Sequence, residues 1–165
     1  MARRYSRAFS IRPVRSVKEY IESVNLGVAG ATTTTIALVS SVNNYTGTAG
    51  TCPIGATVKY IELQIYIQRT LAVDASMDYY IAKQPAGTLA LPVPGSLGGS
   101  AVRRFIFHAG KGLTTREDDG AMVRIVRLRI PPRFRRFGEN DILQLQVRSA
   151  TDYNVCVLAT YKWFS

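Results

Sequence analysis

Apolar and polar side chains alternate along this chain with a period of two, and this pattern constrains the fold more than any other feature of the sequence. It is clearest in residues 61–68, IELQIYIQ, and 143–148, LQLQVR. Successive side chains of a β-strand point to opposite faces of the sheet, so each stretch should form a strand with one buried face. No segment has a comparable helical period, and we therefore predict an all-β protein.

Six further segments are rich in β-branched and aromatic residues and are separated by clusters of Gly, Pro, Asn and Asp. Residues 17–24, within the first of them, fit a helix equally well. A chain of 165 residues corresponds to one domain. The eight predicted strands cover residues 17–25, 31–42, 56–69, 76–83, 102–110, 121–130, 142–149 and 153–164.

Eight antiparallel strands in one domain predict a sandwich or a barrel, and the double-sheet jelly roll is one of the main solutions. The connections after the first, third and seventh strands are short, whereas those after the second, fourth and sixth are long. A jelly roll gathers these two sets at opposite ends, although the connection after the fifth strand, of about ten residues, fits this pattern poorly. We expect a single eight-stranded antiparallel jelly-roll sandwich over residues 16–165.

Positive charge is concentrated at the beginning of the chain. The protein has 21 Lys and Arg against 11 Asp and Glu, a net charge of +10. Residues 1–15 hold five arginines and no acid, so they supply half of this excess. They show no strand or helix period, and Pro13 lacks a backbone donor near their end. We therefore predict a flexible, arginine-rich arm over residues 1–15.

The composition of this arm favours contact with nucleic acid. A guanidinium group can bind two oxygens of one phosphate at once, and aromatic rings can stack on unpaired bases. A solubilising tail or a nuclear import signal has a similar composition, and import could coexist with nucleic-acid binding. The residues that we assign to the contact are Arg3, Arg4, Arg7, Arg12, Arg15, Tyr5 and Phe9.

A second basic and aromatic cluster, RFRRF at residues 133–137, lies between the sixth and seventh predicted strands. We favour a contact between subunits here over a contact with nucleic acid. The last predicted strand is apolar on both faces, so a neighbouring subunit or another part of the same chain must cover its second face. The predicted interface residues are Arg133, Phe134, Arg135, Arg136, Phe137 and Trp163.

Several other arginines fit either interior-facing or solvated strand positions, and the sequence does not choose between these. They are Arg103, Arg104, Arg124, Arg127 and Arg129.

The sequence offers little support for a metal or catalytic site. Glu117, Asp118 and Asp119 could give oxygen ligands to a structural calcium ion, but we favour a solvated turn because the alternating acids of a calcium loop are absent. The single histidine, His108, cannot form a site of several imidazoles, and no catalytic triad or phosphate-binding glycine loop is evident. Two cysteines in different contexts predict no disulfide framework. We expect no enzyme activity and no cofactor.

Four stretches carry a resemblance to known coat proteins. They are residues 12–18, RPVRSVK; residues 32–35, TTTT; residues 130–141, IPPRFRRFGEND; and the ending at residues 153–164. In this order they resemble capsid proteins of small circular Rep-encoding single-stranded DNA (CRESS) viruses. This group is similar to the single jelly roll of satellite necrosis virus coat proteins. The resemblance covers nearly the whole chain.

The resemblance implies a structural protein of the virion. It implies an icosahedral shell of about 60 identical subunits, with the arm inside around a short single-stranded genome. It favours DNA over RNA as the packaged partner. It also implies that the protein occurs in the virion and, during assembly, inside the host cell, where the nucleus is one expected location.

Two other classes of protein remain as alternatives. A basic β-barrel that binds single strands without assembling, such as an OB-fold module, is the main one, although OB-folds have five strands. A jelly-roll lectin would have no need of the basic arm. No apolar run reaches the roughly 18–20 residues of a membrane span, and no signal-peptide pattern occurs. We expect a soluble protein with no membrane partner and no small-molecule substrate.

Overall fold

The computed structural model describes residues 16–41, 50–70, 74–85, 91–95, 103–114 and 121–165 of the chain. These residues form strands, apart from short helical segments and the connections. The elements are β1 Ser16–Val28, β2 Thr33–Ser40, β3 Gly50–Thr51, β4 Thr57–Arg69, β5 Ala75–Pro85, β6 Ile106–Thr114, β7 Ala121–Arg129, α2 Pro132–Arg135, β8 Asp141–Ser149 and β9 Tyr153–Phe164.

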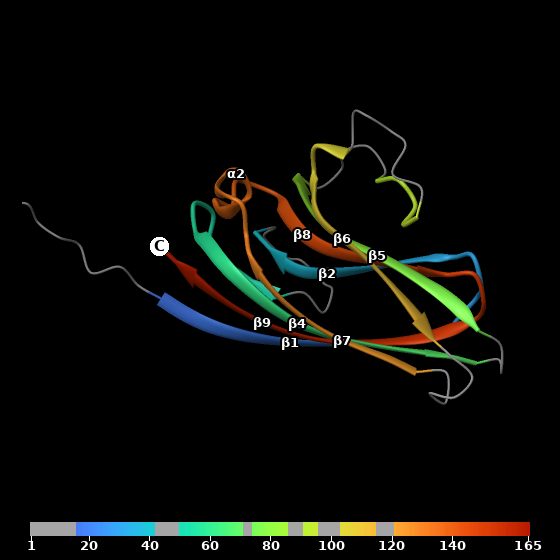
Figure 1. Ribbon diagram of the computed structural model, residues 1–165. Coiled ribbons are helices and arrows are strands. Elements are labelled where there is room, and N and C mark those ends of the chain that lie inside the picture. Colours follow the sequence, from blue (N-terminus) through green and yellow to red (C-terminus); the bar gives the residue numbers. More distant parts are fainter. Residues whose placement is uncertain (1–15, 42–49, 71–73, 86–90, 96–102, 115–120) are drawn as a thin grey trace, which may run out of the picture.

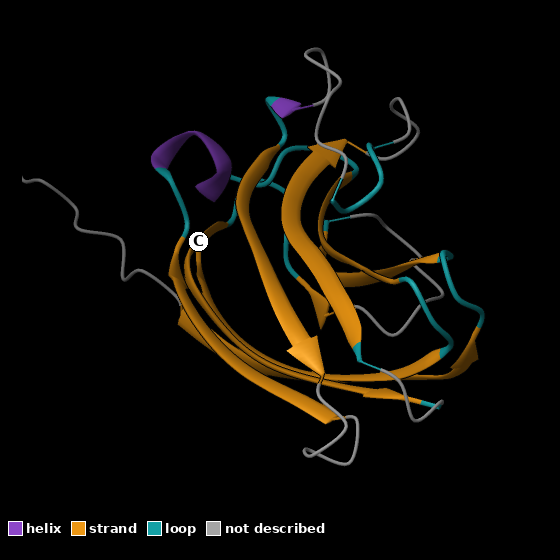
Figure 2. Ribbon diagram, turned by 45° about the vertical axis from the view of Figure 1, so that its right-hand side comes forward, coloured by secondary structure: helices purple, strands orange, loops and turns teal. Residues whose placement is uncertain are grey.

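The strands form two sheets that face each other across the core, as in a β-sandwich (Figures 1 and 2). Sheet A has the strand order β1-β9-β4-β7, and sheet B has the order β3-β2-β8-β5-β6. Every pair of neighbouring strands is antiparallel except β2 and β3, which are parallel. The prediction of an all-β protein is therefore confirmed.

The strand pairs are nested within one another along the sequence. The first long strand pairs with the last, β1 with β9, and the pairs β2 with β8, β4 with β7 and β5 with β6 lie successively further inside. The chain thus forms one long antiparallel ribbon that is closed by additional pairing of β9 with β4 and of β8 with β5.

Each of the eight predicted segments overlaps one of the long strands. The first is a strand and not a helix, and it extends to Val28. The fifth begins later than predicted, at Ile106, because Arg103 is helical and residues 104–105 form a turn before it. The same strand also ends later than predicted, at Thr114, so the connection between β6 and β7 is only residues 115–120. The prediction missed β3, whose two residues are too few to show an alternating pattern.

The core lies between the inner faces of the two sheets. Sheet A contributes the apolar half of the alternating β4 pattern, including Leu63 and Ile65, and both are fully enclosed. Sheet B contributes Leu145 and Val147 from β8 together with Ile81 from β5, all equally enclosed. Burying such a side chain stabilises the fold by about 1.5–3 kcal/mol, so the alternation seen in the sequence is what holds the sheets together.

The two ends of the sandwich differ in the length of their connections. The short connections leave from one end, and the longer ones with α2 leave from the other. The short connections are residues 29–32, 70–74, 115–120 and 150–152. Ser16, the first residue of β1, pairs with Phe164 of β9, so the start of β1 and the end of the chain lie together at the α2 end (Figure 1). No helix among the described residues is long and apolar enough to cross a membrane.

Candidate nucleic-acid interface

The face of sheet A that points away from the core carries a basic cluster at the α2 end. One residue from each of the four strands meets its neighbours in register there: Lys18 pairs with Lys162, Lys162 with Tyr60, and Tyr60 with Arg129. All four side chains are exposed, and Tyr60 is 57% exposed. Strands pair about 4.8 Å apart, so three cations and an aromatic ring lie within a strip about 15 Å wide.

The next row along the sheet adds a further cation and an acid. Glu62 of β4 pairs with Thr160 of β9 and with Arg127 of β7. Arg127 Nε donates a hydrogen bond to Glu62 Oε2 over 3.0 Å. The two rows together line an open hollow of about 570 Å³.

An irregularity in the sheet brings another cation to this face. The register between β4 and β9 shifts between Val58 and Tyr60, which leaves Lys59 as an extra residue. Lys59 Nζ lies 4.9 Å from the centre of the Phe164 ring, and Lys162 Nζ lies 5.4 Å from it. Phe164 is therefore contacted by two ammonium groups.

The balance of charge makes this cluster a candidate for binding a polyanion. Among the described residues of the two rows, Glu62 is the one acid, and Arg127 already neutralises it. No ion pair joins Arg129 or Lys162 to a described carboxylate. Exposed cations attract phosphate groups and release counterions on binding them. The cluster of Lys18, Lys59, Arg127, Arg129 and Lys162 is called the basic cluster below.

The position of the basic cluster relates it to the arm. Ser16 begins β1 only two residues before Lys18, and its partner Phe164 is the ring that Lys59 and Lys162 contact. Ser16, the residue that follows the predicted arm of residues 1–15, therefore lies beside the basic cluster. The arm residues assigned to nucleic acid, Arg3, Arg4, Arg7, Arg12, Arg15, Tyr5 and Phe9, lie outside the described residues, and so do Glu117, Asp118 and Asp119.

The predicted interface residues around α2 divide into core aromatics and surface arginines. Phe134, Phe137 and Trp163 are buried in the core of this chain, and a side chain enclosed by its own subunit offers little surface to another. Arg133 and Arg136 are exposed, with the Arg133 guanidinium 4.6 Å from the centre of the Phe134 ring. A subunit contact at this loop would thus be made by the arginines and not by the aromatic rings.

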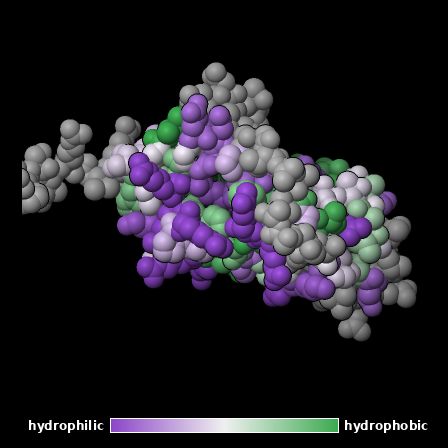
Figure 3. Space-filling model, turned by 90° about the horizontal axis from the view of Figure 1, so that it is seen from above, coloured by the Kyte–Doolittle hydropathy of each residue, from purple (hydrophilic) through white to green (hydrophobic). Residues whose placement is uncertain are grey.

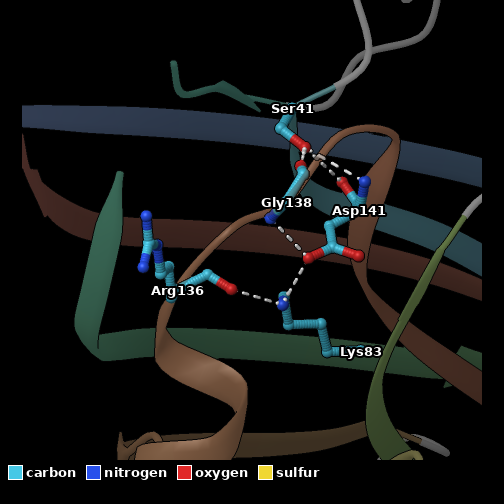
Figure 4. A network of polar contacts seen from close by, with 5 residues as sticks. All are labelled: Ser41, Lys83, Arg136, Gly138 and Asp141. Carbon is cyan, nitrogen blue, oxygen red and sulfur yellow. Dashed lines mark hydrogen bonds and ion pairs between the residues drawn. The ribbon is translucent and has the colours of Figure 1, made fainter. Parts of the chain in front are cut away.

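A network of polar contacts holds the α2 loop against the sandwich (Figure 4). Lys83 of β5 donates to Asp141 Oδ2 over 2.6 Å and to the carbonyl oxygen of Arg136 over 2.8 Å. Asp141 Oδ2 also accepts from the backbone N–H of Gly138, and Ser41 Oγ donates to the Gly138 carbonyl oxygen. The loop that follows α2 is therefore fixed at both of its ends.

The other chemically reactive groups lie apart from the basic cluster. His108 lines a hollow of about 340 Å³ with Arg103, Phe107 and Arg133, and burial lowers the pKa of its imidazole. Both cysteines are free thiols, and burial raises the pKa of Cys52 to about 12. Within the described part of the chain, no three His, Cys, Asp or Glu residues are grouped so that they could hold a metal ion.

The surface of sheet B has a different character. Figure 3 shows the molecule from above the view of Figure 1. The described surface on this side is mainly hydrophilic, with small and separated hydrophobic areas. A hollow on its outer side is lined by uncharged residues, among them Thr33, Thr35, Gln84 and Gln144.

Comparison with known proteins gives no identification, because no family model and no curated protein matches this chain.

Proposed function

We propose that this protein is the coat protein of a small icosahedral virus, which assembles into a closed shell and packages a short single-stranded genome through its basic arm. The domain is proposed to be a jelly roll, and DNA is favoured over RNA as the genome. The protein is not proposed to have enzyme activity or a cofactor. Its partners are further copies of itself and the packaged nucleic acid, within the virion and the host cell.

The nested pairing of strands carries this proposal. A jelly roll is one antiparallel ribbon rolled into two sheets, and it requires the first strand to pair with the last and each inner strand with its counterpart. The pairs β1–β9, β2–β8, β4–β7 and β5–β6 meet this requirement. A five-stranded OB-fold barrel would not produce four nested pairs, so this order favours the coat-protein class over the main alternative.

The charge distribution supports a packaging role for the arm. Five arm arginines would join the sandwich beside the five cations of the basic cluster, so that both would contact the same nucleic acid on one side of the subunit. Neutralising phosphates in this way requires no particular base sequence. A shell subunit must contact whichever stretch of the genome lies next to it, and it therefore needs binding that does not depend on base sequence.

The experiment that tests assembly is sedimentation and negative-stain microscopy of the purified full-length protein, with absorbance at 260 and 280 nm. We expect uniform closed particles that contain nucleic acid. A monomer that stays stable across salt and pH would instead support the non-assembling module that binds single strands.

The role of the arm is tested by deleting residues 2–12 or by changing Arg3, Arg4, Arg7 and Arg12 to Ala. The melting temperature should change little, and the packaged nucleic acid should fall. Each lost phosphate contact should reduce the slope of log K against log salt by about 0.7 for a single strand. Replacing Arg103 and Arg104 with Ala is the control, since both are exposed body residues outside the basic cluster. Unchanged packaging by the truncated protein would reject the arm as the main contact.

A further inference from the structure

Beyond the basic cluster, the outer face of sheet A becomes apolar. Val24 of β1 pairs with Cys156 of β9, Cys156 with Tyr66 of β4, and Tyr66 with Val123 of β7. This row crosses the whole sheet without a charged residue. Tyr66 remains 40% exposed and Val123 63% exposed, so the row is a surface and not part of the core.

The neighbouring row continues the apolar surface towards the basic cluster. Leu158 pairs with Gln64, and Gln64 pairs with Ile125. Leu158 and Ile125 are both exposed, and Glu22 at the β1 edge is the one charged residue among the described residues of the two rows. The apolar shelf is defined as Val24, Tyr66, Val123, Ile125, Cys156 and Leu158.

The two exposed tyrosines connect the shelf with the basic cluster. Tyr60 and Tyr66 both lie on the outer face of β4, six positions apart, which corresponds to about 20 Å along a strand. One ring stands among cations and the other among apolar side chains. A ligand that extends along β4 would therefore meet positive charge and flat aromatic surfaces together.

Charge complementarity decides which partner this face fits. A second copy stacked on the same face would bring Arg129 and Lys162 against a surface whose acids are few, with Glu62 already paired to Arg127. A duplex would use the cations and leave the apolar shelf exposed to water, because its bases are already stacked. A single strand has phosphates for the cations and unpaired base faces for the tyrosines and the shelf.

We propose that the outer face of sheet A is a binding platform for single-stranded nucleic acid, with phosphates on Arg129 and Lys162 and bases against Tyr60, Tyr66 and the apolar shelf. This inference rests on the proposed packaging function and names a second site for the same partner, on the sandwich itself. Contacts with phosphates and base faces make the platform tolerant of base sequence and selective for single strands over duplexes.

The direct test is photocrosslinking of the full-length protein to an oligothymidylate in which 5-iododeoxyuridine replaces some thymidines. The iodinated base crosslinks to aromatic side chains that it contacts. Peptide mapping by mass spectrometry should place crosslinks at Tyr60 and Tyr66 of β4, and a duplex of the same length should give few crosslinks there. Crosslinks found at other tyrosines alone would overturn the proposal.

Affinity measurements separate stacking from charge. Changing Tyr60 and Tyr66 to Ser should weaken oligothymidylate binding about tenfold per tyrosine, since stacking of one base contributes about that factor. Changing both to Phe keeps the rings and should retain the affinity. The measurements are made at raised salt, where the contribution of the arm is screened and that of stacking is not. Equal affinities for the Ser and Phe variants would contradict a platform.

The outcomes distinguish this inference from the proposed function. If the protein forms particles but neither crosslinks nor affinities involve β4, the coat-protein proposal stands and the platform is rejected. If β4 crosslinks to the single strand but no particles form under any condition, the platform stands and the shell is rejected. Melting curves establish whether the Ser variants are folded, and if they are not, the crosslinks at Tyr60 and Tyr66 decide the proposal.

Discussion

Lys83 Nζ lies 2.6 Å from Asp141 Oδ2, and the two side chains are only 7% and 13% exposed. The same ammonium group donates to the carbonyl oxygen of Arg136 and lies 4.7 Å from the centre of the Phe137 ring. In an enclosed ion pair each charged group has lost its water and is stabilised by its partner. Removing one residue therefore leaves the charge of the other uncompensated. This contact ties β5 to the beginning of β8 and to the α2 loop.

Replacing Lys83 with Met should destabilise the protein by about 3–5 kcal/mol, because the Asp141 carboxylate would remain enclosed without its cation. Urea denaturation of the unassembled subunit measures this free energy. The matched control is Lys111→Met, which breaks an ion pair with Asp78 in which the lysine side chain is 76% exposed. That change should cost no more than about 1 kcal/mol. Equal losses for both variants would show that the enclosure of Lys83 has no special effect.

The strands could be predicted from the sequence because burial on one face imposes the period of two. The stretch 61–68 shows it in full, and Ile61, Leu63, Ile65 and Ile67 are all buried. The start of β6 was misplaced because residues 103–105 have apolar and basic side chains that a strand would also accept. The two residues of β3 are a strand only because they pair with β2, and two residues are too few to show an alternating pattern.

The basic cluster and the apolar shelf could not be predicted, because they exist only through pairing between distant strands. Arg127 and Arg129 belong to β7, Tyr60 to β4 and Lys162 to β9, and nothing in the local sequence tells which strands are neighbours. The buried positions of Phe134 and Phe137 were equally hidden, since a basic and aromatic loop has the same composition whether its rings point inward or outward.

The hydroxyl group of Tyr153 joins the two sheets, and removing it should cost stability. The ring is fully enclosed, and its oxygen lies 3.0 Å from the Val147 carbonyl oxygen and 2.9 Å from Thr34 Oγ1. Tyr153→Phe leaves these buried groups without this partner, which should lower the free energy of unfolding by about 1–3 kcal/mol. Thermal or urea denaturation measures the loss. Tyr66→Phe is the control, since the exposed Tyr66 ring should tolerate the change within about 0.5 kcal/mol.

The two thiols should differ in reactivity towards a maleimide. Cys52 is buried with a pKa raised to about 12, so it should react only when the protein unfolds. Cys156 is half-buried on the outer face of sheet A, and burial followed by the charge of Glu22 raises its pKa above 9.0. Since the thiolate is the reactive form, its labelling rate should still increase as the pH rises through 9.0.

Mass spectrometry of the labelled peptides assigns this reactivity. Cys156→Ser should abolish labelling of the folded protein, and Cys52→Ser should leave it unchanged. Rapid labelling of Cys52 under native conditions would contradict the enclosure of that thiol.

His108 should make the protein less stable in acid. Burial lowers its pKa from the usual 6.5, its Nε2 is enclosed without a partner among the described residues, and Arg103 and Arg133 line the same hollow. The unfolded chain therefore takes up a proton at a higher pH than the folded protein. Above pH 6.5 both states are neutral at this residue, and stability decreases as the pH falls from 6.5 towards the lower folded pKa.

The variant His108→Gln isolates this effect, because glutamine keeps a polar side chain and does not titrate. Other ionisable groups act on both proteins, so the difference between their unfolding free energies is the quantity to follow. That difference should be constant above pH 6.5 and should move in favour of the variant as the pH falls below it. Urea denaturation across this range measures it, and parallel curves for the two proteins would show that the imidazole is protonated equally in the folded and unfolded states.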